Sequence, residues 1–365
     1  MRICIDARKI GDFGIGTYVR NLLEAYTRVR TGHRFFPIFN PEDAAGFRHP
    51  DAFTPCISRS GKYSLNEHWD IPRILRRVKA HLYHSTHYVT PLLNTVPMVV
   101  TIHDLIHLIF PQYLPSRAAY AYAKLMLVHS VIKAERVITD SEWSKRDLIR
   151  LLHTPEAKIR VIHLAVDERF GKRHRSEWIP VLRHGLKIED PYVLFVGNFK
   201  PHKNVGNLIR AFQHVPEGLC RHLVLTGKGW DRAADLQRLA AETGLTGRIL
   251  VKEGLSFDEI NALYNGAELL VLPSFYEGFG LPPLEAMASG IPVAASRAAS
   301  IPEICGEAAL YFDPDSPREI ADAVLRLLND ARLRASFVRK GLKRVGRYSW
   351  EKTANETLNV YREVL

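Results

Sequence analysis

Two glutamates, Glu277 and Glu285, lie eight positions apart in a segment that combines glycines with prolines. The segment follows an apolar run at 268–272 that predicts a buried strand, and it leads into a predicted helix that ends near Ser289. Glycines let the backbone approach a ligand closely, and the amides at the start of a helix attract an anion such as a phosphate. Because a carboxylate would repel a phosphate, we expect both glutamates to accept hydrogen bonds from sugar hydroxyls.

A second turn of this kind, at 196–204, carries Asn198 and Lys203 after a glycine. A lysine at the start of a helix opposes the helix dipole unless an anion lies nearby, so we predict that Lys203 binds a phosphate. A solvated lysine would show the same pattern. Two further glycine turns, at 227–229 and 14–17, also follow predicted strands and allow close backbone approach.

A histidine, His103, closes another predicted strand in the sequence Thr101-Ile102-His103-Asp104. Histidines in such positions are more often structural hydrogen-bonding residues than catalytic ones. A further strand end carries Asp140 and Ser141, either of which can cap the next helix. The residues alone therefore leave the role of His103 open.

Predicted strands and helices alternate along most of the chain. In the first half the strands are expected at 2–6, 35–39, 81–84, 97–102, 136–139 and 159–162. In the second half they are expected at 192–196, 222–226, 248–251, 268–272 and 292–295. Such alternation is typical of parallel sheets covered by helices, with ligands at the carboxyl ends of the strands. The sequence thus predicts an α/β fold.

The alternation fails between about 166 and 188, where the chain becomes polar, basic and aperiodic. We therefore predict a first Rossmann-like domain at 1–170, a linker at 171–188 and a second Rossmann-like domain at 189–346. A last helix, within 347–365, has room to cross back to the first domain.

The chain has 365 residues and a formal net charge of +11. No stretch approaches the roughly 20 unbroken apolar residues of a membrane-spanning helix, and the first residues predict a strand rather than a signal peptide. We therefore expect a cytoplasmic protein. The positive charge favours polyanions, which include nucleotide phosphates, an anionic membrane surface and nucleic acid. Because no nucleic-acid-binding motif accompanies the charge, we expect no nucleic acid partner.

Neither the cysteines nor the paired aspartates indicate a metal site. The cysteines are isolated and lack metal-ligand spacing, so we expect reduced core thiols at Cys4, Cys56, Cys220 and Cys305. The pair Asp313 and Asp315 precedes a predicted helix at 317, which favours turn formation and capping over metal binding.

Several motifs together resemble the retaining GT-B glycosyltransferases of family 4, over nearly the whole chain. The specific part is Glu277-x7-Glu285 within SFYEGFGLPPLEAMASGIPV. Four further matches are less specific when taken alone: GxGT at 14–17, TIHD at 101–104, the lysine after the VGN turn, and Gly227-x-Gly229. The opening IDAR with GIGTY, and HKN at 202–204, look most like the bacterial branch that contains O-antigen mannosyltransferases. The resemblance implies two Rossmann-like domains that face each other across a cleft.

The resemblance also implies a role for each matching residue. Glu277 and His103 would be the catalytic residues, with Glu277 on the hydroxyls of the transferred sugar and His103 facing the sugar and its acceptor. Glu285 would bind the donor ribose, and Lys203 with the Gly16 amide would hold the diphosphate. The full set of substrate-binding residues would be Gly16, Asn198, Lys203, Gly227, Gly229, Phe279, Gly280, Leu281 and Glu285. The chain departs from the family at Asn198, where an arginine is frequent, so Lys203 would carry more of the phosphate charge.

The expected activity is therefore transfer of a sugar from a GDP- or UDP-linked donor to a glycan or lipid-linked acceptor, with retention and without a metal or other cofactor. GDP-mannose is the expected donor because of the branch resemblance. The alternatives are a GT-B sugar-nucleotide epimerase or phosphorylase and a non-catalytic glycan- or nucleic-acid-binding protein. An amphipathic segment at 71–79 suits peripheral membrane contact or packing on a core, and we favour the core.

Overall fold

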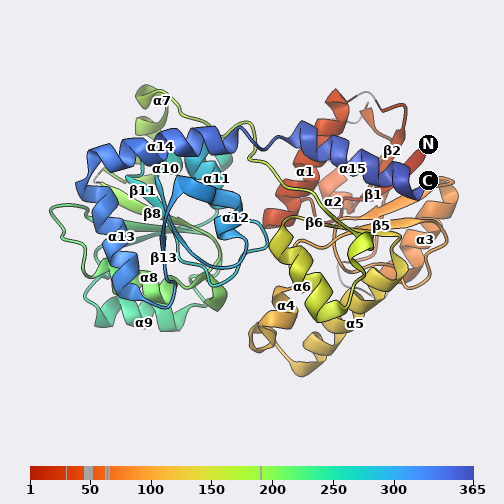
Figure 1. Cartoon of the computed structure of the whole chain (residues 1–365), viewed down its shortest axis with the longest axis horizontal. Helices are drawn as coiled ribbons and strands as arrows, with labels where there is room; N and C mark the ends of the chain where they lie inside the picture. Colours follow the sequence, from red (N-terminus) through yellow and green to blue (C-terminus); the bar gives the residue numbers. More distant parts are fainter. Residues whose placement is uncertain (30, 45–51, 62–63, 65, 190) are drawn as a thin grey trace. The chain divides into compact units, whose positions relative to one another are not determined.

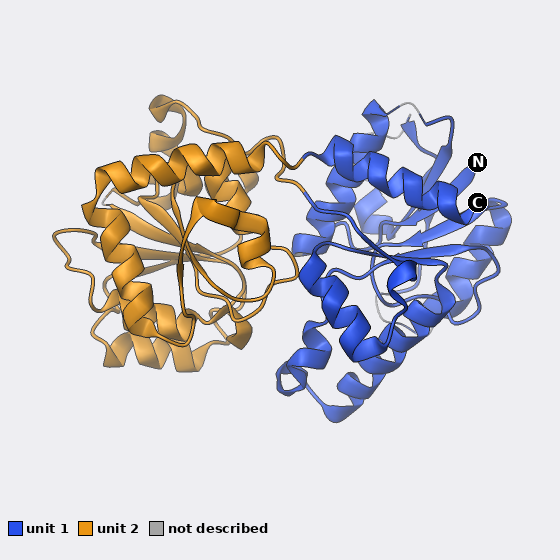
Figure 2. Cartoon of the chain, viewed as in Figure 1, with its two compact units in different colours: residues 1–164, 349–365 blue, residues 165–348 orange. Residues whose placement is uncertain are grey.

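The computed structural model of the chain describes residues 1–29, 31–44, 52–61, 64, 66–189 and 191–365. These residues form two compact units (Figure 2). Unit 1 consists of residues 1–164 and 349–365, and unit 2 of residues 165–348. The chain therefore passes between the units twice.

Unit 1 is built on a parallel sheet of seven strands (Figure 1). Along the sheet the order is β3-β2-β1-β4-β5-β6-β7, so the direction of winding reverses between β1 and β4. In open α/β sheets, ligands bind at the carboxyl ends of the strands beside such a reversal. The strands are β1 (Arg2–Asp6), β2 (Arg34–Phe39), β3 (Cys56–Ile57), β4 (Leu82–Ser85), β5 (Met98–Thr101), β6 (Arg136–Thr139) and β7 (Ile159–Val161).

In the described part of unit 1, seven α-helices connect or cover these strands. They are α1 (Phe13–Arg28), α2 (Pro41–Ala44), α3 (Glu67–Arg77), α4 (Ile106–Ile109), α5 (Arg117–Lys133), α6 (Glu142–Leu152) and α15 (Trp350–Val364). The apolar face of α3 is buried in the core, as favoured above for 71–79. The last helix, α15, packs on α1, and its Tyr361 hydroxyl lies 2.6 Å from His84 Nδ1. The C-terminal helix thus completes unit 1.

Unit 2 has a parallel sheet of six strands in the order β10-β9-β8-β11-β12-β13. The winding reverses between β8 and β11, which makes their carboxyl ends the corresponding ligand position. The strands are β8 (Tyr192–Val196), β9 (His222–Thr226), β10 (Ile249–Lys252), β11 (Leu269–Leu272), β12 (Val293–Ser296) and β13 (Ala309–Phe312).

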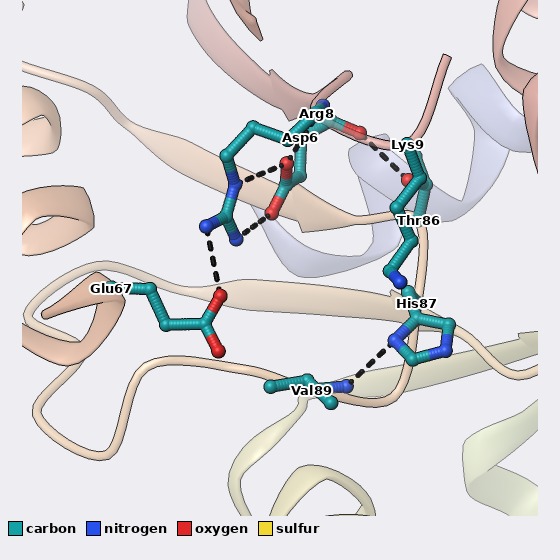
Figure 3. A pocket seen from close by; sticks show the side chains of 7 residues that line it. All are labelled: Asp6, Arg8, Lys9, Glu67, Thr86, His87 and Val89. Atoms are coloured by element: carbon teal, nitrogen blue, oxygen red, sulfur yellow. Dashed lines mark hydrogen bonds and ion pairs between the residues drawn. The ribbon is translucent and has the colours of Figure 1, made fainter. Parts of the chain in front are cut away.

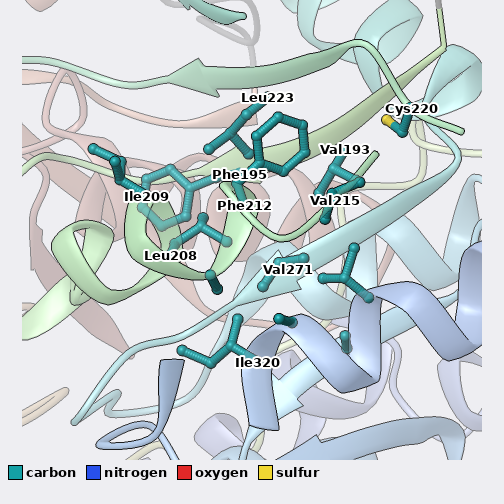
Figure 4. Close-up of a cluster of buried hydrophobic side chains, with 14 of the residues drawn as sticks. Val193, Phe195, Leu208, Ile209, Phe212, Val215, Cys220, Leu223, Val271 and Ile320 are labelled. Carbon is teal, nitrogen blue, oxygen red and sulfur yellow. The ribbon is translucent and has the colours of Figure 1, made fainter. Parts of the chain in front are cut away.

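The sheet of unit 2 is covered by helices whose apolar residues join those of the strands in one core (Figure 4). Phe195 of β8, Phe212 of α8 and Ile320 of α13 are buried there. The helices are α7 (Arg175–Pro180), α8 (Val205–Phe212), α9 (Ala234–Glu242), α10 (Phe257–Gly266), α11 (Leu281–Ala288), α12 (Ile301–Cys305), α13 (Pro317–Asn329) and α14 (Ala331–Val345). The α/β class and the two Rossmann-like domains predicted from the sequence are confirmed.

The structure differs from the prediction at residues 171–188, which were expected to form a linker. They contain α7 and a π-helical turn (Val181–Leu186), and both pack against α10 within unit 2. Leu182 and Leu186 are buried. The apolar residues of this segment are few and stand among basic residues, so they show no helical periodicity. The helix could therefore not be predicted from the sequence pattern. The boundaries between the units lie at 164/165 and 348/349.

Candidate functional site

Lys203 and Glu277 form a partly buried ion pair at the reversal point of the unit 2 sheet. Glu277 follows β11 and Lys203 follows β8, and these two strands are neighbours. Lys203 Nζ donates to both carboxylate oxygens of Glu277, at 2.7 and 2.8 Å. The side chains are 14% and 11% exposed, respectively. The cation predicted for the phosphate and the carboxylate predicted for the sugar therefore lie in direct contact.

Two serines hold the Glu277 loop in place. Ser274 Oγ, which is buried, donates to Glu277 Oε1 at 2.6 Å. Ser300 Oγ donates to the backbone carbonyl oxygens of Glu277 and Phe279, at 2.8 and 3.1 Å. Sequence reasoning missed both serines, because each acts through a contact that only the folded loop creates. They fix the carboxylate and the backbone on either side of Gly278.

The same loop ends at the first turn of α11, where an anion could bind. Gly280 has a φ of 101°, in the left-handed region that favours glycine, and it turns the chain into the helix. Pro282 and Pro283 have no N–H group. The amides of Gly280 and Leu281 are therefore the donors at this helix start, where N–H groups have no partner within the helix.

Glu285 lies in α11 beside Tyr264 of α10. The Tyr264 hydroxyl donates to Glu285 Oε2 at 2.6 Å. Burial raises the pKa of Glu285 to about 7, and the hydrogen bond from Tyr264 only partly opposes this rise. The Glu285 carboxyl group therefore titrates near neutral pH.

In unit 1, His103 pairs with Asp140 across neighbouring strand ends. His103 follows β5, Asp140 follows β6, and His103 Nδ1 lies 2.7 Å from Asp140 Oδ2. Tyr18 of α1 packs edge-on against the His103 ring, with 4.9 Å between the ring centroids. Burial alone would lower the pKa of His103, but the Asp140 carboxylate outweighs it and raises the pKa above its usual value.

The far atoms of this pair, His103 Nε2 and Asp140 Oδ1, are buried and have no hydrogen-bond partner in the described part of the chain. Buried polar atoms are normally hydrogen-bonded, so these two atoms have the capacity to bond to water, an ion or a ligand. The neighbouring Asp104 instead accepts from the Ile106 amide at 3.0 Å, so it orients the loop before α4. Sequence reasoning considered Asp140 only as a cap.

The remaining predicted residues lie at turns. Asn198 Oδ1 accepts from the Lys200 amide at 3.2 Å and shapes the turn after β8. Gly16 lies in the first turn of α1, where a Cβ atom would overlap with the Ile10 carbonyl group. Gly229 has a φ of 100°. Asn198 and Gly16 thus shape the backbone around them, and the predicted contacts of all three residues with substrate stay predictions.

Gly227 allows the loop after β9 to pass directly over the backbone of Gly197, and a Cβ atom there would overlap with the Gly197 carbonyl group. We predict that Gly227→Ala destabilises the protein by about 3 kcal/mol, because the backbone must shift to relieve the overlap. Thermal or chemical unfolding measures this change. Gly247→Ala, where a Cβ atom would meet nothing within 4 Å, is the matched control. Equal stability of the two variants would contradict the prediction.

A small pocket lies at the reversal point of the unit 1 sheet (Figure 3). Arg8, just after β1, binds both oxygens of Asp6 and donates to Glu67 Oε2 at 2.8 Å. The other oxygen, Glu67 Oε1, is buried and has no hydrogen-bond partner in the described structure. The wall opposite is formed by Thr86, His87 and Val89, which follow β4. The pocket therefore presents Glu67 Oε1 at the carboxyl ends of β1 and β4.

Asp313 and Asp315, which were compared above with a metal site, shape a turn. Asp313 Oδ1 accepts from the Asp315 amide at 2.9 Å, and Ser316 caps α13. Within the described residues, no group of three or more His, Cys, Asp or Glu side chains is placed to hold a metal ion.

Comparison with known proteins connects both units to one class of enzyme. Residues 182–344 match the family model "Glycosyl transferases group 1", and residues 14–170 match "Glycosyltransferase Family 4". The chain is 33% identical to O-antigen chain mannosyltransferase B of Escherichia coli over 291 residues, which cover 79% of this chain and 76% of that protein. The chain belongs to the group 1, family 4 glycosyltransferases. It is also 31% identical to the O-antigen chain mannosyltransferase RfbU of Salmonella typhimurium, over 66% of this chain and 63% of that protein.

Solved structures share the fold of this glycosyltransferase. A sucrose-phosphate synthase from Thermosynechococcus elongatus aligns with a TM-score of 0.81 and 21% identity, over 100% of this chain and 98% of that one. The Anabaena protein HepE, in complex with UDP-glucose, aligns with a TM-score of 0.81 and 17% identity over the whole of both chains. The fold is therefore GT-B. None of the helices in the described part of this glycosyltransferase has both the length and the apolar character needed to cross a membrane.

Proposed function

We propose that this glycosyltransferase moves mannose from GDP-mannose to a glycan or lipid-linked acceptor in bacterial polysaccharide synthesis. The observation that carries the proposal is the Lys203–Glu277 ion pair beside the start of α11. It combines a cation for a diphosphate with a carboxylate for sugar hydroxyls. Mannose is supported by the relatives, since three of them are named as O-antigen or serotype-specific mannosyltransferases.

In the proposed reaction, the bond between the anomeric carbon and the β-phosphate oxygen breaks, and the acceptor oxygen bonds to the same face of that carbon. The leaving phosphate takes the proton of the acceptor hydroxyl, so the reaction is balanced and the configuration is retained. Negative charge grows on the leaving diphosphate, and Lys203 with the Gly280 and Leu281 amides would stabilise it without reorganising. No metal ion has a role in this scheme.

The other groups are assigned by their chemistry. The Glu285 carboxylate would accept hydrogen bonds from the donor ribose, and Glu277 would accept them from the sugar. His103 Nε2, buried and unpartnered in the described structure, would contact the sugar or its acceptor. We assign the acceptor to unit 1, where the pocket of Arg8 and Glu67 offers an acceptor atom for a glycan hydroxyl.

Incubation with GDP-mannose, UDP-glucose and UDP-N-acetylglucosamine tests the proposal through the nucleotide that is released. We expect GDP from GDP-mannose, at a rate unchanged by a metal chelator. UDP release from a uridine donor alone would contradict the assigned donor. No nucleotide release and no nucleotide binding with any donor would contradict the proposed reaction altogether. NMR of the product gives the anomeric configuration.

We predict that GDP binds about tenfold more tightly at pH 8 than at pH 6, because ribose hydroxyls need an ionised Glu285 and the pKa of that group is raised to about 7. Calorimetry at a series of pH values measures the change. In Glu285→Gln the affinity should be lower and nearly independent of pH, apart from the titration of GDP itself.

Glu277→Ala should keep the nucleotide affinity and lower turnover. Equal losses of affinity at the two positions would refute this division of roles.

A further inference from the structure

A series of hydrogen-bonded side chains crosses the interior of unit 1, and the proposed reaction does not use it. Helices α1 and α15 pack on each other (Figure 1), and β4 pairs with β5, so segments from both ends of the sequence meet here. All the side chains involved are buried. Five of them form what we call the buried network: Tyr26, Tyr361, His84, Thr101 and Tyr18.

The buried network is continuous from α15 to α1. The Tyr26 hydroxyl donates to the Tyr361 hydroxyl at 3.3 Å, and the Tyr361 hydroxyl lies 2.6 Å from His84 Nδ1. On the other side of the imidazole, His84 Nε2 lies 2.8 Å from Thr101 Oγ1. Thr101 Oγ1 in turn lies 3.2 Å from the Tyr18 hydroxyl. Each member therefore contacts the next at hydrogen-bonding distance.

The protonation of His84 gives these hydrogen bonds a direction. Burial, and to a smaller extent the nearby His103, lower the pKa of His84 to about 3, so the ring is neutral and has one N–H group. The Tyr361 hydroxyl accepts from Tyr26, so its own hydrogen is available to His84 Nδ1. In this arrangement His84 Nε2 donates to Thr101, whose hydrogen is left for Tyr18. Tyr361 thus selects the tautomer of His84.

The buried network ends at the aromatic ring that packs on His103. The ring centroids of Tyr18 and His103 are 4.9 Å apart, and Asp140 Oδ2 lies 2.7 Å from His103 Nδ1. The imidazole of His103 is therefore held both by a ring contact and by a carboxylate. A second residue of α15, Trp350, has its ring centroid 6.3 Å from that of Tyr18. Helix α15 thus supports Tyr18 both through hydrogen bonds and through ring packing.

The polar composition of the buried network exceeds what packing requires. Apolar side chains of the same shape would fill this space without the cost of removing hydroxyl groups and an imidazole from water. What a buried polar network adds is a single fixed arrangement of the side chains that it joins. Here the arrangement is that of the Tyr18 ring beside His103. Helix α15, which begins next to the boundary between the units, forms part of it.

We propose that the buried network positions the His103 ring, so that helix α15 contributes to catalysis without touching the substrate. Tyr18, His84 and Tyr361 are then positioning residues, since each acts through its neighbour and the last of them through the Tyr18 ring. The inference rests on the proposed contact of His103 with the sugar or its acceptor.

Two substitutions that each remove one hydroxyl group interrupt the buried network: Tyr361→Phe in α15 and Thr101→Val in β5. Each should lower kcat by about three- to tenfold, because His103 is no longer held in one orientation. The KM for the donor should stay nearly unchanged, since the donor is assigned to unit 2. The double variant should lose little more than either single variant, because both interrupt the same network.

Tyr192→Phe is the matched control for these kinetics. Tyr192 is a buried tyrosine of unit 2 whose hydroxyl donates to the Leu263 carbonyl oxygen at 2.7 Å, outside the buried network. Its loss removes a buried hydrogen bond of the same kind, and kcat should stay at the wild-type value. Thermal unfolding of all the variants establishes that each is folded at the assay temperature.

An NMR measurement follows the His103 ring in the absence of substrate. Its ring signals, assigned by comparison with His103→Gln, should shift in Tyr361→Phe and in Thr101→Val but not in Tyr192→Phe. Unshifted His103 signals in both network variants, or a wild-type kcat in both, would overturn the inference while an inactive His103→Gln still supported the proposed function. Full activity of His103→Gln would contradict the proposed contact of His103 and the inference with it.

Discussion

Replacing Lys203 with alanine is expected to lower kcat/KM by about a thousandfold, because one fixed donor to a developing negative charge is typically worth that much. Glu277→Ala should have an effect of similar size. Lys203 Nζ contacts both Glu277 oxygens, so removing either residue leaves the partly buried charge of the other without its ionic partner. Steady-state kinetics with GDP-mannose measure both losses.

The double variant Lys203→Ala, Glu277→Ala decides whether the pair acts as a unit. We expect a loss close to that of either single variant, since residues that act together are strongly non-additive. Lys343→Ala, an exposed lysine of α14 in the same unit, is the control and should keep full activity. Losses that simply multiply would show that Lys203 and Glu277 serve the donor independently.

Replacing Asp140 with asparagine is expected to lower kcat by about 10- to 100-fold, because a hydrogen-bonded carboxylate sets the orientation and basicity of the histidine that it holds. The pKa of His103 is raised in the folded protein by Asp140, so the variant should titrate His103 at a lower pH. An NMR titration of the His103 ring and the pH profile of kcat measure this shift.

The same pair makes stability depend on pH in a defined direction. A histidine with a raised folded pKa stabilises the protein fully below its unfolded pKa of about 6.5, and this contribution disappears as the pH rises through the folded pKa. Asp140→Asn should remove that dependence. Asp70→Asn is the control, because Asp70 accepts from Ser58 Oγ at 2.7 Å and has a structural role in unit 1. An unchanged His103 titration in Asp140→Asn would refute the assigned role.

Local sequence patterns were sufficient to predict most elements. The helix predicted to begin at 317 is α13, and the helix predicted to follow Asp140 is α6. Both helices have a capping serine before them and a regular apolar face, so their ends and their buried sides are encoded locally. The two-residue strand β3 had no such signal and was not predicted.

The pairing of side chains within the site could not be predicted in the same way. Lys203 and Glu277 are 74 positions apart, and they meet because β8 and β11 are neighbours. His103 and Asp140 meet because β5 and β6 are neighbours. Strand order is a property of the whole sheet, whereas each motif shows only that its residues follow some strand. The position of Asp140 directly after a predicted buried strand could nevertheless have identified it as a candidate site residue.

The position of α15 determines the order in which the chain can be completed during synthesis. Residues 349–365 belong to unit 1, so the ribosome makes the whole of unit 2 between the two parts of unit 1. Until α15 emerges, the buried hydroxyl of Tyr361 is missing from its contacts with Tyr26 and His84, and α1 lacks the helix that covers it. Unit 1, whose sequence begins first, is therefore completed only after unit 2 has been made.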